Sequence, residues 1–562
     1  MLHEHSKFTS PTEPLEEDRL PDDGSDSPLL LHQLFQDAAH AAFHQPLVDF
    51  YGREFTYGQI AIEAARVARG LQALGVDRSH KVGLLLPNIP QYVSAYYGIS
   101  MAGAVIVNFS PLYTAEDIIR QIEDSGTEVL ITMNSALLLP KAIEALDKSS
   151  LRHVVVARLD TRLSLMRSVL FRLFKSDETA DIPDRPDVSR FQELVDNEGD
   201  YRAWIGDPTS ALAMLQYTGG TTGQPKGAML THANLTTNAH QLLFVDPVRG
   251  GEDRIIGALP LFHIFANTVI LNRTVANRGA IIMLPRFSAY DVADAIARTR
   301  PTALPGVPSM FETLLDHPRF PGIDWSSLAT CVVGGAPLPE RLATRFEKST
   351  GIALTQGYGL TETAGVVAAN RTGDQVLPSC VGAPLAGTSI RIVDPDAPHE
   401  DVSAGALGEI LVSGPQVMSG YLNEPPGTQF SGKYLRTGDI GHLDRDGRLH
   451  VVDRIKDMIS VGGFKAYPRN IEDVLRSHPD IIDAAVVAKP HERLGEVPQA
   501  FVVQRRGKPL GIFQAMEWVN ERVSKHERLF GLEFVDELPR TPIGKLDRKS
   551  IRQERVIERM VA

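Results

Sequence analysis

The sequence predicts an α/β protein with parallel sheet in its first part, a β-rich part after it and a smaller α+β unit at the end. Helical patterns alternate with short β-branched runs between residues 28 and 299, as in repeated β–α units. After Val381 the pattern changes to short strands separated by Gly and Pro turns. The 562 residues are too many for a single hydrophobic core, so two or more domains are expected.

The expected elements follow the chain in a simple order. In the first part they are helix 59–74, strands 81–86 and 104–108, helix 115–125, strands 128–132, 153–157, 253–259 and 279–284, and helix 289–299. Later elements are strands 389–393, 408–413 and 449–452, helix 471–477, strands 483–488 and 499–504, and helix 514–523. Ser94, Ser100 and Asn108 interrupt the apolar run 93–109, which favours a buried helix and strand over a membrane span.

Charge is spread unevenly along the chain. Residues 1–27 hold eight acids and two bases, which predicts a disordered acidic tail rather than a signal peptide. Residues 454–562 hold 16 acids and 20 bases, which favours a small anionic ligand there or reflects chance variation in surface charge. There is no dense basic stripe of the kind that binds nucleic acid. The two cysteines, Cys331 and Cys380, lack metal-ligand spacing and suit a reducing, cytoplasmic compartment.

The segment 161–175 (TRLSLMRSVLFRLFK) combines four bases with apolar residues at helical spacing. A basic amphipathic helix can lie in an anionic membrane interface, which would place the protein peripherally at the inner membrane face. Packing against its own domain, or against a second copy in a homodimer, explains the same pattern. The sequence leaves these alternatives open.

The stretch 217–227 (YTGGTTGQPKG) directly follows the apolar run 211–215. Its glycines let successive backbone N–H groups converge on an anion, its Thr hydroxyls can donate to phosphate oxygens, and its Lys supplies positive charge. No G-x-x-x-x-G-K-[ST] pattern fits, so it is not a Walker A loop. We therefore expect a triphosphate-binding loop after a strand. Its candidate residues are Thr218, Gly219, Gly220, Thr221, Thr222 and Lys226.

Five further motifs follow in order: GGAP (334–337), QGYGLTET (356–363), LRTGD (435–439), DRIKD (453–457) and PIGK (542–545). Each is weak alone, but their order and spacing behind the Thr/Gly/Lys loop are specific. Together with LPLFHIFANT (259–268) and GPQVMSGY (414–421), they resemble the ANL superfamily of adenylate-forming enzymes, and the sequence is most similar to bacterial long-chain fatty acid–CoA ligases.

The resemblance implies a large N-terminal domain (28–453) of parallel sheets and helices with a β-barrel-like lobe, and a small mobile C-terminal domain (454–562). It also implies an ATP- and Mg²⁺-dependent reaction. A carboxylate attacks the α-phosphate, pyrophosphate leaves, and the acyl group then passes to the thiol of CoA. Because two anions must meet, positive charge and fixed donors should dominate catalysis. AMP, rather than ADP, is the expected product.

The family's functional residues carry over to the matching positions of this sequence. Glu362 is implied to bind Mg²⁺, Thr361 to contact the α-phosphate, and Lys545 to bridge the carboxylate and the α-phosphate. The implied nucleoside contacts are Gly335, Ala336, Pro337, Tyr358 and Gly359 for adenine, with Asp439 and Arg454 for ribose. Lys456 is the implied hinge, whose rotation brings Gly462 and Gly463 to the pantetheine arm of CoA. Candidates for the CoA phosphates are Lys465, Arg505 and Arg506.

The acid pocket is expected from segments 259–268, 304–314 and 357–365, with His263 as a gate at its mouth or as a packed core histidine. Its expected apolar side chains are Phe262, Ile264, Phe265, Val307, Met310, Phe311 and Leu360, with Val366 nearby. Such a lining favours a medium- or long-chain fatty acid, and an aryl acid or dicarboxylate remains open. An amino-acid substrate is disfavoured, because acids other than Glu312 and Glu362 are missing from these segments.

Two other functions compete with a CoA ligase. An acyl-AMP ligase that loads a carrier protein usually carries an insertion that hinders domain rotation, and none is evident between Glu340 and Lys456. A non-catalytic acyl-binding protein would not need the joint presence of Lys226, Glu362, Asp439, Arg454, Lys456 and Lys545. The expected partners are therefore a small carboxylic acid, ATP and CoA.

Overall fold

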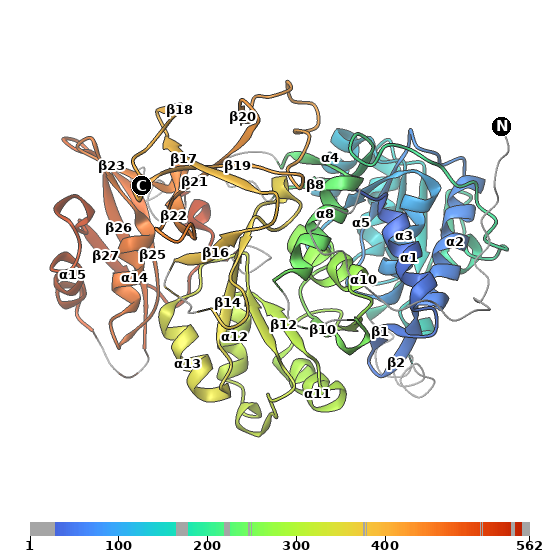
Figure 1. The fold of residues 1–562 in the computed structure, drawn as a ribbon, viewed down its shortest axis with the longest axis horizontal. Coiled ribbons are helices and arrows are strands. Elements are labelled where there is room, and N and C mark those ends of the chain that lie inside the picture. Colours follow the sequence, from blue (N-terminus) through green and yellow to red (C-terminus); the bar gives the residue numbers. More distant parts are fainter. Residues whose placement is uncertain are drawn as a thin grey trace.

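The computed structural model describes residues 28–163, 178–218, 225–245, 248, 250–374, 377, 379–505, 507, 510–540 and 546–553. Its strands form three sheets arranged along the long axis of the molecule, with the N-terminal segments at one end and the C-terminal segments at the other (Figure 1). The predicted tail 1–27 and most of segment 161–175 lie outside the described residues. The α/β prediction is confirmed.

The first sheet has seven strands in the order β7-β6-β5-β3-β4-β8-β9. Neighbouring strands are parallel, except for the antiparallel pair β8 and β9 that flanks the Thr/Gly/Lys loop. The bounds are β3 (Lys81–Leu84), β4 (Val105–Asn108), β5 (Val129–Met133), β6 (His153–Ala157), β7 (Val188–Arg190), β8 (Leu212–Tyr217) and β9 (Gly227–Thr231).

The second sheet begins as a parallel sheet and continues as an antiparallel lobe. Its order is β18-β17-β19-β21-β22-β16-β15-β14-β13-β12-β10-β11-β1-β2, and β20 pairs with β21. The parallel part has β1 (Pro46–Phe50), β10 (Arg254–Gly257), β11 (Ala280–Met283), β12 (Ala303–Gly306), β13 (Thr330–Val333) and β14 (Leu354–Tyr358), with β2 (Arg53–Thr56) antiparallel at its edge.

The antiparallel lobe corresponds to the β-rich part predicted after Val381. Its strands are β15 (Ala368–Ala369), β16 (Cys380–Pro384), β17 (Ser389–Asp394), β18 (Ala397–Asp401), β19 (Gly408–Ser413), β20 (Phe430–Ser431), β21 (Tyr434–Leu443) and β22 (Leu449–Arg454). The link is direct, because β15 pairs antiparallel with both β14 and β16. The lobe therefore holds its side chains at a fixed position relative to the parallel strands.

The third sheet belongs to the C-terminal unit and has its own hydrophobic core. Its strands are β23 (Ile459–Val461), β24 (Phe464–Ala466), β25 (Ile481–His491), β26 (Gly495–Gln504) and β27 (Gly531–Phe534). Its helices are α14 (Pro468–Arg476), α15 (Ile512–Asn520) and α16 (Arg548–Ile551). This is the α+β unit that the sequence predicted.

Helices cover the two large sheets, and several of them begin at a residue whose side chain caps the helix. Thr56, Thr114 and Thr231 each accept a backbone N–H from the third residue of the helix that follows. The helices are α1 (Leu31–Ala41), α2 (Tyr57–Ala73), α3 (Pro90–Ala102), α4 (Ala115–Ser125), α5 (Leu139–Lys148), α7 (Phe191–Leu194), α8 (His232–Leu243), α9 (Ile264–Ala266), α10 (Arg273–Ala276), α11 (Ala289–Thr299), α12 (Pro308–Leu315) and α13 (Glu340–Thr350).

The apolar run 93–109 forms part of α3 and all of β4, as predicted. Every residue of α3 is buried, and the helix ends at Gly103, whose φ is +91°. A Cβ at Gly103 would lie 2.9 Å from the Trp204 ring, so both the turn and the packing require glycine. Within the described ranges, no helix has the length and apolar character needed to cross a bilayer.

Candidate active site

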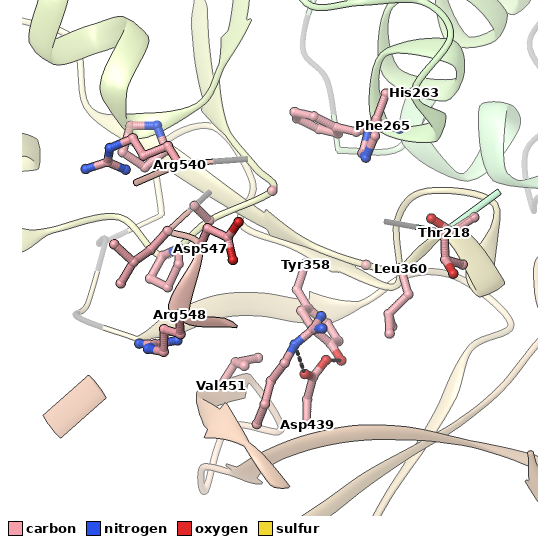
Figure 2. Close-up of a pocket in the computed structure, with 18 of the residues that line it drawn as sticks. Thr218, His263, Phe265, Tyr358, Leu360, Asp439, Val451, Arg540, Asp547 and Arg548 are labelled. Carbon is pink, nitrogen blue, oxygen red and sulfur yellow. Dashed lines mark hydrogen bonds and ion pairs between the residues drawn. The ribbon is translucent and has the colours of Figure 1, made fainter. Parts of the chain in front are cut away.

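A cavity of about 1900 Å³ lies where the carboxyl ends of β8 and β14, the lobe and the C-terminal unit meet. Strand ends are the expected place for a ligand site in an α/β sheet, because loops with different side chains converge there. Thr218 and His263 lie on one side of Tyr358, whereas Asp547 and Arg548 of the C-terminal unit lie on the other (Figure 2). The cavity therefore combines residues of the large unit with residues of the C-terminal unit.

The phosphate side of the cavity is built on the hairpin between β8 and β9. Thr218 and Lys226 close it, with the Thr218 N–H donating to the Lys226 carbonyl at 3.0 Å, and both residues line the cavity. The strand end is also fixed from the side, since the Tyr217 hydroxyl donates to Asp124 at 2.5 Å. The remaining candidates Gly219, Gly220, Thr221 and Thr222 lie outside the described residues.

Glu362 follows the end of β14 and is held from two directions. The Met418 N–H donates to the Glu362 carbonyl at 2.8 Å, and the Tyr421 hydroxyl donates to its carboxylate. Burial and the neighbouring Glu362 raise the pKa of Tyr421, so this hydroxyl keeps its proton and remains a donor. Thr361 lies beside Glu362 at the cavity wall. One carboxylate fits Mg²⁺ that arrives with ATP, because Mg²⁺ commonly takes few protein ligands together with phosphate oxygens and water.

The predicted nucleoside contacts converge on Asp439. The Tyr358 hydroxyl donates to one carboxylate oxygen at 2.6 Å, and the Arg454 guanidinium lies 2.9 Å from the other (Figure 2). The negative charge of Asp439 raises the pKa of Arg454. The register explains the meeting, since Asp439 on β21 pairs directly with Arg454 on β22. Gly335, Ala336, Pro337 and Gly359 line the same cavity.

Gly359 has no room for a side chain. A Cβ there would lie 2.0 Å from the Gly365 carbonyl oxygen, because the chain after Thr361 turns back tightly through Ala364, whose φ is +52°. This close approach places Tyr358 and Glu362 on the same cavity wall. Any larger residue at Gly359 would push the two apart.

The backbone around His263 is held by buried amide and phenol side chains. Asn88 donates to the Leu259 carbonyl at 2.7 Å and accepts from the Leu261 N–H at 2.8 Å. A second chain of hydrogen bonds runs from the Tyr92 hydroxyl to Asn108, then to Gln216, and from Gln216 to the Phe262 carbonyl. His263 itself accepts the Phe265 N–H at 3.3 Å and lines the cavity.

The structure changes the expected lining of the acid pocket. Phe262, Ile264, Phe265, Leu360 and Val366 line the cavity as predicted. Val307, Met310 and Phe311 do not; they are buried, and from their segment the cavity is lined by Pro308, Ser309 and Glu312. Phe311 instead packs edge-on against Phe346 of α13, with ring centroids 5.3 Å apart. Helical periodicity therefore turns Phe311 towards α13 rather than towards the cavity.

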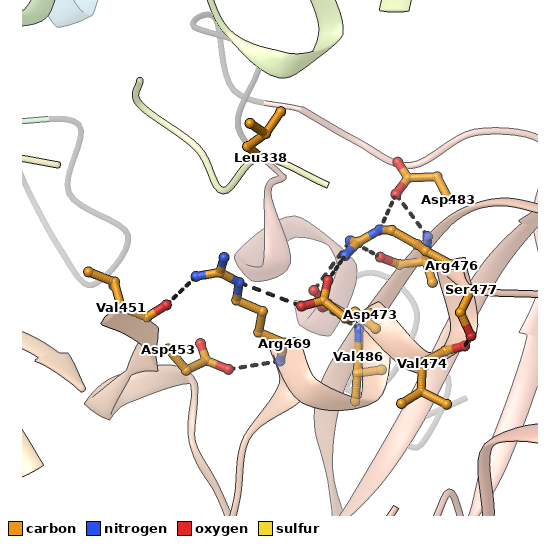
Figure 3. Close-up of polar contacts among 12 residues, drawn as sticks. Leu338, Val451, Asp453, Arg469, Asp473, Val474, Arg476, Ser477, Asp483 and Val486 are labelled. Carbon is orange, nitrogen blue, oxygen red and sulfur yellow. Dashed lines mark hydrogen bonds and ion pairs between the residues drawn. The ribbon is translucent and has the colours of Figure 1, made fainter. Parts of the chain in front are cut away.

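The C-terminal unit meets the nucleotide side through charged groups. Arg469 of α14 donates from its guanidinium to the Val451 carbonyl at 2.6 Å, and its backbone N–H donates to Asp453 at 2.8 Å (Figure 3). Its guanidinium also lies 3.8 Å from Asp473, which in turn pairs with Arg476 at 3.1 Å. These contacts connect β22 with α14 on the two sides of Lys456, whose pKa is lowered by burial and by Arg454.

Lys545 lies outside the described residues, but both flanks of its segment are fixed. Arg540 pairs with Asp483 at 2.5 Å, and Arg548 makes a bidentate contact with Glu472. Arg540 and Leu546 also form an isolated antiparallel bridge. All four of these ionic residues line the cavity, so both described flanks of residues 541–545 lie at the cavity wall.

Of the predicted CoA residues that the structure describes, only Arg505 lines the cavity. Gly462 and Gly463 form the turn between β23 and β24, with φ angles of +57° and +86°, and neither lines the cavity. Lys465 lies 3.3 Å from Asp396 of the lobe, whereas Arg505 lines the cavity. Arg506 lies outside the described residues.

Sequence reasoning missed several residues that shape the site. Asn108, Gln216 and Tyr421 line the cavity, and Arg469 joins the two units. Tyr421 lies in the GPQVMSGY motif, and Arg469 lies in the segment that follows DRIKD. Their positions in or after these motifs were the sequence signal that could have identified them. Asn108 and Gln216 carried only one signal, since each is a polar residue at the end of an apolar strand.

Comparison with known proteins agrees with this geometry. Residues 34–422 match the AMP-binding enzyme family, and residues 470–545 match the AMP-binding enzyme C-terminal domain. The chain is 33% identical over 535 residues to a long-chain-fatty-acid–CoA ligase of Bacillus subtilis, covering 93% of this chain and 94% of that protein. It is 34% identical over 514 residues to a feruloyl-CoA synthase of an Amycolatopsis species, covering 91% and 96%.

A solved structure extends the comparison to the fold. An anthranilate–CoA ligase in complex with anthranoyl-AMP superimposes with a TM-score of 0.83 at 25% identity, covering 96% of this chain and 100% of that one. Fold and site together define an adenylate-forming enzyme of the acid–thiol ligase class. The chain belongs to the AMP-binding enzymes, and the family prediction is confirmed.

Proposed function

We propose that the chain is an AMP-forming fatty acid–CoA ligase for medium- or long-chain acids. The observation that carries this proposal is the convergence of Lys226, Glu362, Asp439 and Arg454 on one cavity with apolar side chains beside His263. Phosphate, ribose and acyl groups would each meet matching chemistry there. The similarity to long-chain-fatty-acid–CoA ligases supports the same substrate class.

In the first step, a carboxylate oxygen attacks the α-phosphorus of ATP and forms a P–O bond. The bond to the bridging oxygen of pyrophosphate breaks, and pyrophosphate leaves with that electron pair. Lys226 and the Thr218 hydroxyl would hold the leaving phosphates, and Glu362 would hold Mg²⁺, which supplies charge neutralisation when it is bound. Asp439 and Arg454 would fix the ribose. Lys545 would bridge the two reacting anions.

In the second step, the thiolate of CoA attacks the acyl carbon and AMP leaves. We propose that the part of the C-terminal unit beyond Lys456 turns about that residue, while the chain before it, including Arg454, stays in place. The turn would withdraw Lys545 and bring Gly462 and Gly463 to the cavity. Two features support it. The glycine turn does not line the cavity in the described arrangement, and hydrogen bonds of Arg469, rather than a shared core, join α14 to β22.

An aryl acid is the second candidate substrate. Phe262 and Phe265 line the cavity, whereas Val307, Met310 and Phe311 do not extend it as an aliphatic tunnel. A panel of aliphatic acids of increasing length, together with benzoate and ferulate, distinguishes the two when acid-dependent AMP is measured with and without CoA. We expect the highest kcat/KM with an aliphatic acid. AMP formation from aryl acids alone would reject the fatty-acid proposal, and no AMP from any acid would reject ligase activity.

A further inference from the structure

Lys226 has an anionic partner within the protein. Its Nζ lies 2.8 Å from a carboxylate oxygen of Glu424 and 5.4 Å from the centroid of the Tyr421 ring. Both side chains of the ion pair line the cavity, and they are 48% and 34% exposed. Glu424 therefore occupies a position beside the ammonium group that a phosphate oxygen would need.

The position of Glu424 is set by backbone contacts rather than by chance at the surface. The Leu422 N–H donates to the Gly227 carbonyl at 2.8 Å, and the Met229 N–H donates to the Gly420 carbonyl at 2.9 Å. Asn423 adopts a φ of +61° and donates from its amide to the Asp124 carbonyl at 3.1 Å. Segment 418–424 is thus attached along β9, next to Lys226.

The same segment also contacts Glu362, whose carboxylate is proposed to bind the metal. Met418 donates to the Glu362 carbonyl, and Tyr421 donates to the Glu362 side chain. One short segment therefore contacts both Lys226 and Glu362. A change in the contact with Lys226 can therefore shift the contact with Glu362, because Tyr421 lies between the two residues.

We propose that Glu424 is a resident counter-ion for Lys226, which the triphosphate of ATP must displace, so that Glu424 weakens the apparent affinity for ATP. This inference rests on the proposed function of the cavity. Carboxylate and phosphate oxygens accept the same hydrogen bonds from an ammonium group, so they compete for it. A pair this exposed breaks readily, and the displaced carboxylate turns away from the like-charged phosphates.

The test is Glu424→Gln, which removes the charge and keeps the shape. We expect the KM for ATP in acid-dependent AMP formation to fall about threefold. Glu424→Asp should remain closer to the wild type. The control Glu347→Gln removes an exposed carboxylate from α13 and should leave the KM unchanged. An unchanged or raised KM for ATP in Glu424→Gln would overturn the proposal, since a raised value would make Glu424 a ligand.

A double-mutant cycle separates counter-ion behaviour from simple repulsion of ATP. Equilibrium binding of ATP with Mg²⁺ should be improved by Glu424→Gln in the wild type and much less in Lys226→Met. An equal improvement in both backgrounds would overturn the counter-ion role. If the wild type forms AMP but Glu424→Gln does not change the binding of ATP, this inference alone is rejected. A wild type that neither binds ATP nor forms AMP rejects the proposed function.

Discussion

The two walls of the cavity are held together by different kinds of contact. On the wall of the large unit, amides, phenols and backbone pairs fix the position of His263 and Glu362. On the wall of the C-terminal unit, charged side chains such as Arg469 and Arg548 make the connections. Buried neutral networks define one arrangement. The ion pair of Arg548 with Glu472 lies within the C-terminal unit and would move with it. The contacts that a turn would have to break are the hydrogen bonds of Arg469 with β22. This difference agrees with the proposal that the first wall stays in place while the C-terminal unit turns.

The largest expected effect is a loss of the first reaction step, but not of the second, when a residue of the C-terminal wall is changed. Lys545→Ala removes a cation of the C-terminal unit. We expect acyl-adenylate formation to fall by about 1000-fold, because a donor to the transition state is lost. Formation of acyl-CoA from supplied acyl-AMP should be largely spared. Measuring pyrophosphate release and thioester formation separately checks this. Equal loss in both would show that the C-terminal wall does not change between the steps.

The buried carboxyl group of Asp453, at the boundary between the two units, should make the free energy of unfolding depend on pH. Burial raises its pKa to about 6, against the opposing effect of Arg548. Between pH 4 and 6 the folded state therefore binds more protons at this site than the unfolded state, so stability falls as the pH rises through this window. Relative to Asp453→Asn, the wild type should lose about 2 kcal/mol in free energy of unfolding across it. Denaturant titrations at pH 4, 5, 6 and 7 measure this difference, and a flat difference would contradict it.

Arg469→Met tests whether the boundary contacts favour the first step. The change removes the guanidinium contact with Val451 while keeping much of the side-chain length. We expect adenylation to fall about tenfold, since one charge-assisted hydrogen bond across the boundary is lost, with no loss in thioester formation from acyl-AMP. Arg522→Met is the matched control, because Arg522 lies over Trp518 within the C-terminal unit. If both variants behave alike, Arg469 has no special role at the boundary.

Gln216→Leu should have the smallest effect and a different signature. It leaves the Phe262 carbonyl and the Asn108 amide without their partner, which shifts the segment that carries His263. We expect about a fivefold rise in the KM for the acid and a small change in the KM for ATP. A rise confined to ATP would place Gln216 with the phosphate loop instead. The acid dependence of AMP formation at saturating ATP decides between them.

Sequence reasoning reached the fold, and it selected residues that the structure brings to one cavity, because both depend on local order. Alternating β–α patterns predicted the parallel strands, and motif order indicated Tyr358, Glu362 and Asp439. It failed for Met310 and Phe311, because an apolar residue next to a site looks the same whether it faces the cavity or the neighbouring helix. It could not find the pairing of Lys226 with Glu424, because that contact joins residues about 200 positions apart through the docking of segment 418–424 on β9.

The pairing of Asp439 with Arg454 has a consequence for the fate of the intermediate. The two residues face each other on β21 and β22, at the last rung before the chain leaves the sheet at Ile455. A turn about Lys456 would therefore leave the grip on the ribose unchanged while the other wall is replaced. On the proposed turn, the enzyme would exchange one catalytic surface for another without releasing acyl-AMP, and the reactive mixed anhydride would stay bound between its two reactions.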